Sequence, residues 1–224
     1  MWFMPIWRLH GNHQVKLVVF GSTGGTGREL VRQALELGHE VTAFARHAQA
    51  VGIFHQRLCI FEGDALKQVS VDAAIEGQGA VLSALGTRSL FKHITLFSQS
   101  AEWIVGSMER QGVQRLVVES SLGVGDSRGQ LGLLGTWIAV PVFLARIYAD
   151  KERQESIIAR SELDWTIVRP AMLTNGPQRG NYRTWSGAAP KPSASRISRA
   201  DVAHLMLSIL TKTETHHRAI NCSY

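Results

Sequence analysis

Near its start the chain contains Val15-Lys16-Leu17-Val18-Val19-Phe20-Gly21-Ser22-Thr23-Gly24-Gly25-Thr26-Gly27, and the fold can be inferred from this segment outward. Its first six residues are mostly apolar and β-branched, which predicts a buried strand over 15–20. Three glycines follow with the spacing GxxGxxG, at Gly21, Gly24 and Gly27, in place of the commoner GxGxxG. Apolar residues at helical spacing up to Leu37, with Gly38 behind them as a C-terminal cap, predict a helix that begins inside this turn.

A strand, a glycine turn and a helix in this order are typical of a site for the phosphates of a dinucleotide. Glycine lets the backbone approach the diphosphate and turn sharply, and the N–H groups at the helix start point at the anion. A tight strand–helix turn without a ligand is the alternative. We predict that the whole turn binds a nicotinamide dinucleotide through Gly21, Ser22, Thr23, Gly24, Gly25, Thr26 and Gly27.

Strands and helices alternate along the rest of the chain. Further strands are predicted over 40–46, 58–61, 80–85, 115–119 and 165–169, and helices over 65–76, 95–111 and 147–160. This order predicts an α/β protein with a doubly wound parallel sheet, the Rossmann fold. We expect a single domain over 15–224 with a small C-terminal substrate-side region, a poorly ordered leader over 1–14, and a binding loop over 174–196.

The composition narrows the classes of partner. The 224 residues carry 24 Lys and Arg against 18 Asp and Glu, a net charge of +6, without a long basic run, so nucleic acid is not expected. Cys59 and Cys222 stand alone, which predicts no metal site and a cytoplasmic location. The apolar segment 131–145 is interrupted by glycine and proline and is too short to span a bilayer. Monomer and dimer both remain open.

The residues that follow the second and third strands bear on the cofactor. Folds that bind NAD place an Asp or Glu after the second strand, whereas this chain has Phe44-Ala45-Arg46-His47. Arg46 can pair with a 2′-phosphate, so NADP(H) is favoured over NAD(H); an exposed surface charge is the alternative. Asp64, followed by Ala65, is expected near the adenine amino group or, alternatively, as the N-cap of the next helix.

The chain also resembles a known family over about 15–210. The segments that carry the resemblance are Phe20 to Gly27, Arg46, Gly63-Asp64, Leu85-Gly86-Thr87-Arg88, Ser120-Ser121 and Trp165 to Pro170. They are similar to atypical short-chain dehydrogenase/reductases with an NmrA-like, NAD(P)H-binding fold, and within them to the biliverdin-IXβ reductase/flavin reductase family. Leu85-Gly86-Thr87-Arg88 is the most family-specific of these segments.

The resemblance implies roles for residues that follow the central strands. It implies that Leu85 and Gly86 line the cofactor ribose and that Arg88 lies at the mouth of the active site. Ser121, preceded by the cofactor-binding Ser120, is implied as a serine near the nicotinamide. The resemblance also implies that Ser98 is a second serine in this pocket and that Lys151 contacts the ribose. It implies a loop over the nicotinamide amide at Pro170, Ala171 and Met172. The family has a histidine where Met172 stands, and 131–145 is far more apolar here, which implies a different or more apolar acceptor.

The chemistry that these residues favour is hydride transfer. The Tyr-x-x-x-Lys pair of short-chain dehydrogenases is absent, because Tyr148 and Lys151 are only three residues apart, so carbonyl reduction is disfavoured. Transfer to a flavin, a quinone or another conjugated, apolar or aromatic acceptor remains feasible. Candidate catalytic residues are Ser121, Ser98 and Lys151. Ser121 could alternatively cap the end of its strand, and Lys151 could belong to a solvated helix start. A non-catalytic NADP(H) redox sensor is the alternative function.

Overall fold

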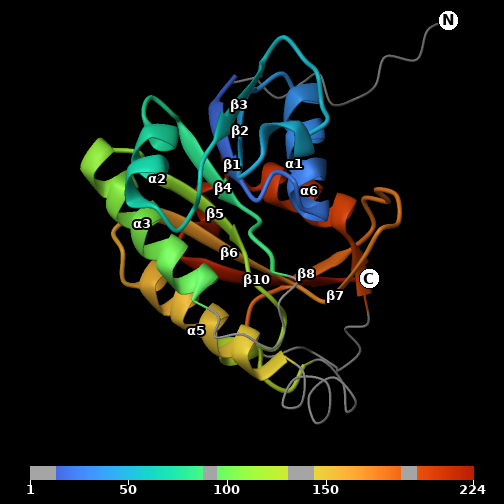
Figure 1. The fold of residues 1–224 in the computed structure, drawn as a ribbon. Helices are drawn as coiled ribbons and strands as arrows, with labels where there is room; N and C mark the ends of the chain where they lie inside the picture. Colours follow the sequence, from blue (N-terminus) through green and yellow to red (C-terminus); the bar gives the residue numbers. More distant parts are fainter. Residues whose placement is uncertain (1–13, 88–94, 131–143, 188–195) are drawn as a thin grey trace, which may run out of the picture.

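A computed structural model describes residues 14–87, 95–130, 144–187 and 196–224. The leader predicted over 1–14 lies almost entirely outside the described residues, as do Arg88 and nearly all of 131–145. In the described parts, eight strands form one sheet in the order β3-β2-β1-β4-β5-β6-β10-β8, and β7 and β9 form a separate pair. Figure 1 shows helices on both faces of this sheet. The predicted doubly wound α/β fold is confirmed.

The amino-terminal half of the sheet grows outward from β1. It contains β1 (Lys16–Phe20), α1 (Gly25–Glu36), β2 (Glu40–Ala45), the short 3-10 helix η2 (Ala48–Ala50), β3 (Leu58–Glu62), α2 (Gln68–Ile75) and β4 (Ala80–Ser83). The strands are parallel, with Phe20 opposite Phe44 on β2 and opposite Ser83 on β4. The chain therefore leaves β1 in one direction, to β2 and β3, and returns to the other side of β1 as β4.

The carboxyl-terminal half adds β5, β6 and β10 in parallel. It contains α3 (Leu96–Gln111), β5 (Arg115–Glu119), η3 (Gly125–Ser127), α5 (Ala145–Ala159), β6 (Asp164–Pro170), β7 (Met172–Thr174), β8 (Arg183–Trp185), β9 (Arg196–Ser198), α6 (Arg199–Ser208), η5 (Thr213–Thr215) and β10 (Arg218–Ser223). β10 pairs in parallel with β6, whereas β8 is antiparallel to β10. The last strand in the chain thus lies inside the sheet.

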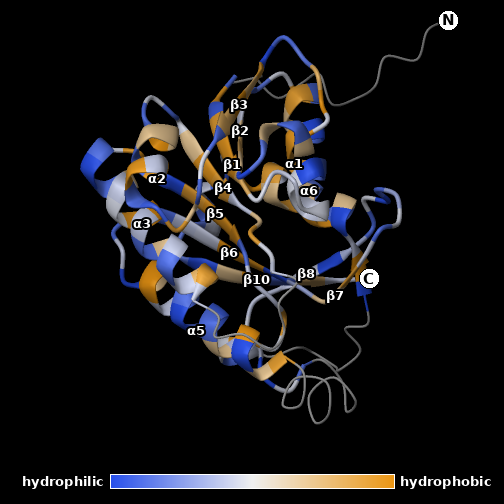
Figure 2. Ribbon diagram, viewed as in Figure 1, coloured by the Kyte–Doolittle hydropathy of each residue, from blue (hydrophilic) through white to orange (hydrophobic). Residues whose placement is uncertain are grey.

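Two apolar cores hold the helices against the sheet. Side chains such as Leu17 and Val19 face α1 and α6, whereas Val18 and Phe20 face α2, α3 and α5. This alternation is the period of two that a strand imposes on its side chains. Figure 2 shows the hydrophobic colour concentrated on the strands around β1, whereas the helices carry both hydrophobic and hydrophilic residues.

A buried arginine ties the end of α6 to the sheet. The guanidinium of Arg115, at the start of β5, donates to the carbonyl oxygens of Ile209, Leu210 and Asp164 at 2.6–2.8 Å. Ile209 is the C-cap of α6 and Leu210 follows it, so this side chain fixes the chain just after the helix to the start of β5. Burial lowers the pKa of Arg115 to about 10, against the opposing charge of Asp164.

The structure corrects several predicted bounds. The helix predicted over 65–76 begins only at Gln68, and the strand predicted over 80–85 ends at Ser83. The loop predicted over 174–196 contains the strand β8, which pairs with β10. The sequence does not predict this strand, because the residues on either side of it are rich in Gly and Pro. Within the described ranges, no helix combines the length and the apolar character that a bilayer crossing requires.

Candidate functional site

Backbone atoms leave no room for a side chain at two positions of the glycine turn after β1. Gly21 has a φ of +80°, and a Cβ there would lie 2.4 Å from the carbonyl oxygen of Ala84, just after β4. A Cβ on Gly27 would lie 2.0 Å from the carbonyl oxygen of Gly21. These glycines let α1 start directly against the ends of β1 and β4, at the point where the strand order reverses and where open α/β sheets bind ligands.

Two hydroxyl groups fix the turn to its neighbours. Ser22 is buried and donates to the carbonyl oxygen of Phe44 at 2.8 Å, and Thr26 donates to the carboxylate of Glu119 at 3.1 Å. Thr23, Gly24 and Gly25 are exposed. The first N–H groups of α1 have no partner within the helix, so the exposed side of the turn presents donors at the positive end of the helix dipole.

Arg46 and Asp64 occupy the positions after β2 and β3. Arg46 is exposed, and within the described ranges its guanidinium forms no ion pair. Asp64 accepts the N–H of Leu66 through its carboxylate at 3.1 Å and that of Lys67 through its carbonyl at 2.9 Å. The alternative that Asp64 is the N-cap of α2 is wrong, because the cap is Lys67 and the helix starts three residues later than predicted. Ala65 is buried in the core beside Phe44.

Most of the residues implied by the family resemblance follow β4, β5 and β6 at the same edge of the sheet. Leu85 is half-buried and Gly86 is exposed with open space around its Cα, whereas Arg88 lies outside the described residues. Ser121 is half-buried, just after β5. Pro170 ends β6, and the next two residues differ in exposure, with Ala171 buried and Met172 64% exposed.

Lys151 lies buried beneath the end of β5. Its ammonium group donates to the carbonyl oxygen of Glu119 at 3.3 Å and stands 4.4 Å from the ring centroid of Phe97. Burial lowers the pKa of Lys151, against the opposing charges of Glu119, Glu155 and Asp150. Burial also raises the pKa of Glu119. The charge of Lys151, the hydrogen bond from Thr26 and the charge of Arg199 lower this pKa and so oppose the effect of burial. The solvated alternative for Lys151 is wrong, because only 6% of the residue is exposed.

A second buried pair fixes Ser120. The hydroxyl of Ser120 donates to Glu155 at 2.5 Å, and the guanidinium of Arg169 donates to the two oxygens of the same carboxylate at 3.0 and 2.6 Å. Arg169 also pairs with Asp126 on η3. A guanidinium and a carboxylate in this fork geometry form one of the stronger protein contacts. The ends of β5 and β6 are therefore held rigidly together beside Ser121.

Ser98 and Tyr148 each use the hydroxyl group in a hydrogen bond within the protein. Ser98 donates its hydroxyl to Asp150 at 2.5 Å, and Asp150 also accepts the N–H of Phe97 at 2.8 Å, so it caps the first turn of α3. Tyr148 donates to the carbonyl oxygen of Leu122 at 2.9 Å, and burial raises its pKa to about 12. Tyr148 and Lys151 thus contact different partners and are not arranged as an acid–base pair.

One charged residue at the glycine turn is not predicted from the sequence. Arg199 begins α6, and its side chain crosses the outer side of Gly25, where a Cβ would lie 2.3 Å from its Cδ. The signal that predicts the start of α6 is the N-cap Ser198, whose hydroxyl accepts the N–H of Asp201 at 3.0 Å. No sequence signal predicts that this helix start meets the turn.

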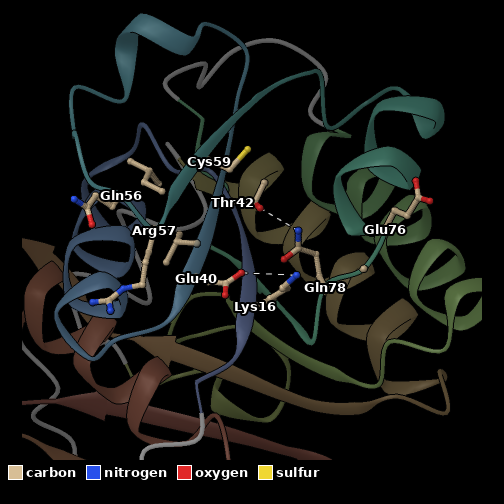
Figure 3. Close-up of a pocket in the computed structure, with 11 residues that line it drawn as sticks. Lys16, Glu40, Thr42, Gln56, Arg57, Cys59, Glu76 and Gln78 are labelled. Carbon is tan, nitrogen blue, oxygen red and sulfur yellow. Dashed lines mark hydrogen bonds and ion pairs between the residues drawn. The ribbon is translucent and has the colours of Figure 1, made fainter.

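A pocket lies at the opposite ends of the strands. It has a volume of about 460 Å³ and is lined by residues that include Lys16, Glu40, Thr42, Arg57 and Gln78. In Figure 3 Lys16 points toward Glu40, and Gln78 is bonded to Thr42. None of the predicted site residues lines this pocket. In the described parts of the chain, no group of three or more His, Cys, Asp or Glu residues is arranged to hold a metal ion.

Comparison with known proteins bears on the cofactor. The family model described as NAD(P)H-binding matches residues 21–213, from the glycine turn almost to the end of the described fold. A chloroplastic protein of Arabidopsis thaliana is 31% identical over 175 residues, which are 74% of this chain and 62% of that protein. The chain therefore spans less than two thirds of the length of this relative.

Solved structures share the same fold. A short-chain dehydrogenase/reductase from Veillonella parvula, in complex with NADP, has a TM-score of 0.79 at 17% identity, over 94% of each chain. An anaerobilin reductase from Escherichia coli O157:H7 has a TM-score of 0.77 at 24% identity, over 93% of this chain and 96% of that one. These likenesses support the fold, with helices on both faces of a mostly parallel sheet.

Proposed function

Because the chain belongs to the NAD(P)H-binding family, we propose that it is an NADP(H)-dependent oxidoreductase that transfers hydride to a flavin, a quinone or another conjugated acceptor. The observation that carries the proposal is the glycine turn. Gly21 and Gly27 have no room for a side chain, whereas Gly24 and Gly25 are exposed beside the N-terminus of α1. This arrangement supports diphosphate binding, because the backbone donors at that helix start are open to a ligand.

Two arginines support NADP(H) over NAD(H). Arg46 is exposed directly after β2, where a carboxylate would repel a 2′-phosphate. Arg28, on the first turn of α1, donates to the carbonyl oxygens of Thr23 at 3.2 Å and Ala50 at 2.7 Å. It therefore adds a second positive charge between the glycine turn and the segment after β2. A guanidinium is well suited to a phosphate, since it offers a planar fork of donors.

The acceptor end of the site favours a conjugated ring over a simple carbonyl. Carbonyl reduction needs an acid that protonates the developing alkoxide. Tyr148 is half-buried, donates its hydroxyl to the carbonyl oxygen of Leu122, and has its pKa raised to about 12. A conjugated acceptor can take up the hydride and receive its proton from solvent or from Ser121. Met172, which is 64% exposed after β6, supplies an apolar contact for such a ring. The solved relative described as an anaerobilin reductase supports the same class of acceptor.

The buried charges below β5 act on the geometry of the site. The bound nicotinamide supplies the hydride. Lys151 holds the carbonyl of Glu119, and Glu155 with Arg169 holds Ser120, so the backbone that carries Ser121 is fixed from below. Rigid placement of this hydroxyl matters because a proton donor works only within hydrogen-bonding reach of the reacting group. Ser121 is thus proposed as the hydrogen-bonding or proton-relay residue, and Lys151 as a positioning residue.

Steady-state turnover tests the proposal. Purified protein is expected to oxidise NADPH when FMN, riboflavin or a quinone such as menadione is added. The control is Gly24→Val: the φ of −75° at Gly24 suits any residue, but the valine side chain obstructs the exposed side of the turn. NADPH binding without turnover above this control across the acceptor panel would contradict catalysis and favour the redox sensor. Absence of NADPH binding would contradict both functions.

Arg46→Gln tests the cofactor preference separately. A charge-assisted hydrogen bond is worth about 1.5–3 kcal/mol, so NADPH is expected to bind roughly ten- to a hundredfold more weakly. NADH, which has no 2′-phosphate, is expected to bind with unchanged affinity. Because Arg46 is exposed, the substitution leaves the fold intact, and an unchanged NADPH/NADH affinity ratio would contradict the role of Arg46.

A further inference from the structure

Arg199 is fixed in place at the first position of α6. Ser198 is the N-cap, its hydroxyl accepts the N–H of Asp201 at 3.0 Å, and Asp201 is completely buried. The same carboxylate accepts the N–H groups of Arg179 and Gly180 at 2.9 and 2.8 Å. The start of α6 is therefore anchored from several sides, and Arg199 projects from a rigid base.

The side chain of Arg199 crosses the start of α1. A Cβ on Gly25 would lie 2.3 Å from the Cδ and 2.7 Å from the Nε of Arg199. Its guanidinium reaches Asn175, just after β7, and donates to the amide oxygen there at 2.6 Å. The absence of a side chain at Gly25 thus makes room for the arginine. This close approach, and not the backbone conformation, is the reason that a glycine stands at this position.

This placement is electrostatically costly without an anion. The N-terminus of a helix carries a positive partial charge, and a cation beside it is repelled. Glu119 provides part of the compensation, since the charge of Arg199 lowers its pKa against the effect of burial. A guanidinium has five N–H donors, and the Asn175 bond is the one hydrogen bond that Arg199 forms in the described parts of the chain. Charge and donors are therefore available for a ligand at this turn.

We propose that Arg199 is a binding residue for the diphosphate of the dinucleotide. The proposal rests on the proposed function and assigns a second source of positive charge to the same site. The N–H groups of α1 and the Arg199 guanidinium reach the phosphates from adjacent directions, as a fork that matches the spacing of phosphate oxygens. Arg46 and Arg199 then recognise different phosphates of one cofactor, the 2′-phosphate and the diphosphate respectively.

Fragments of the cofactor separate these two roles. ADP carries a diphosphate without a 2′-phosphate, and 2′-AMP carries a 2′-phosphate without a diphosphate. We expect Arg199→Gln to weaken binding of ADP and of NADPH roughly ten- to a hundredfold and to leave 2′-AMP unchanged. Arg46→Gln is the matched control, expected to weaken 2′-AMP and NADPH and to leave ADP unchanged. Isothermal titration calorimetry measures the affinities of the wild type and of both variants for each of the three ligands, nine in all, and thermal melts check that both variants are folded.

The outcomes distinguish this inference from the proposed function. If the wild-type protein binds ADP and NADPH, and folded Arg199→Gln binds ADP equally well, the inference is overturned alone. If the wild-type protein binds neither ligand, the proposed function and the inference are overturned together. A loss that affects ADP and 2′-AMP equally also overturns the inference, because it indicates a general disturbance of the site.

Gly25→Ala provides an independent variant. Its Cβ displaces the Arg199 side chain from the turn while the charge of the arginine remains. We expect this variant to weaken ADP binding in the wild-type background and to cause no further loss in the Arg199→Gln background. Equal losses in the two backgrounds would show that Gly25 acts without Arg199 and would overturn the link between them.

Discussion

Replacing Gly27 by alanine is expected to destabilise the protein. The new Cβ would lie 2.0 Å from the carbonyl oxygen of Gly21 and 2.9 Å from the Cα of Ser22, whereas ordinary contacts begin at 3.4 Å. Both neighbours are backbone atoms, so α1 must move away from the end of β1 by more than about an ångström. Overpacking of this kind costs about 1–3 kcal/mol. In a chain of this size each kcal/mol lowers the melting temperature by about 2–4 °C, which gives a fall of about 2–12 °C.

Gly106→Ala, the same chemical change on α3, serves as the matched control with the opposite sign. A Cβ there would lie 3.2 Å from Nη1 of Arg110, the far end of a flexible side chain. Glycine inside a helix is about 0.8–1 kcal/mol less favourable than alanine, so Gly106→Ala is expected to raise the melting temperature by about 2–4 °C. Circular dichroism melts and NADPH titrations measure both variants. If Gly27→Ala melts at or above the wild-type temperature, the argument from close packing is refuted.

Three further outcomes follow from the buried groups. Arg169→Gln leaves the carboxylate of Glu155 buried without its guanidinium partner, so the free energy of unfolding in urea is expected to fall by about 3–5 kcal/mol. The control is Arg128→Gln, which breaks an exposed pair with Glu152 and is expected to cost less than about 1 kcal/mol. Equal losses in the two variants would contradict the argument from burial. Arg115→Lys loses several hydrogen bonds to carbonyl groups and is expected to lower the free energy of unfolding by at least about 2 kcal/mol in the same assay. An unchanged free energy of unfolding would contradict a stabilising role for these hydrogen bonds. Burial raises the pKa of Tyr148 and of Tyr182 from 10.0 to about 12, so the stability that their protonated forms contribute is fully present below pH 10 and lost as the pH rises toward 12. The melting temperatures of the wild type and of the double variant Tyr148→Phe/Tyr182→Phe are therefore expected to change differently with pH between 10 and 12. The same pH dependence in both proteins would contradict the raised pKa of the two tyrosines.

The sequence predicts the features that depend on local backbone constraints. Gly21 and Gly27 are recognisable because the strand–turn–helix context requires glycine there, and a specific close contact explains each requirement. Gly38 has a φ of +94° after α1, as its predicted capping position implies. Strands β1 to β6 follow from apolar segments that alternate with helical periodicity. These features lie within short windows of the chain, where the pattern of residue types is enough.

Features that depend on contacts between distant segments are not predictable in this way. Lys151 stands in the charged sequence Asp150-Lys151-Glu152-Arg153, which is typical of a solvated helix, and only the packing of α5 under β5 buries it. Arg199 reaches Gly25 because α6 lies along α1. β8 is short and polar, and its pairing with β10 defines it as a strand, whereas β10 is defined mainly by its longer pairing with β6. The cofactor and acceptor roles of the site residues, the cytoplasmic location and the oligomeric state stay predictions.

The position of β10 has a consequence for synthesis on the ribosome. β10 pairs on one side with β6 and on the other with β8, so until residues 218–223 have emerged β6 is paired only with β5 and β8 has no partner in the sheet. Until then β6 presents an unpaired edge, and such edges invite association with other chains. The earlier strands β1 to β5 can assemble during translation, whereas the sheet beyond β6 must wait. Ribosome-bound chains that hold residues 218–223 inside the exit tunnel are therefore expected to depend on chaperones more than chains released from the ribosome.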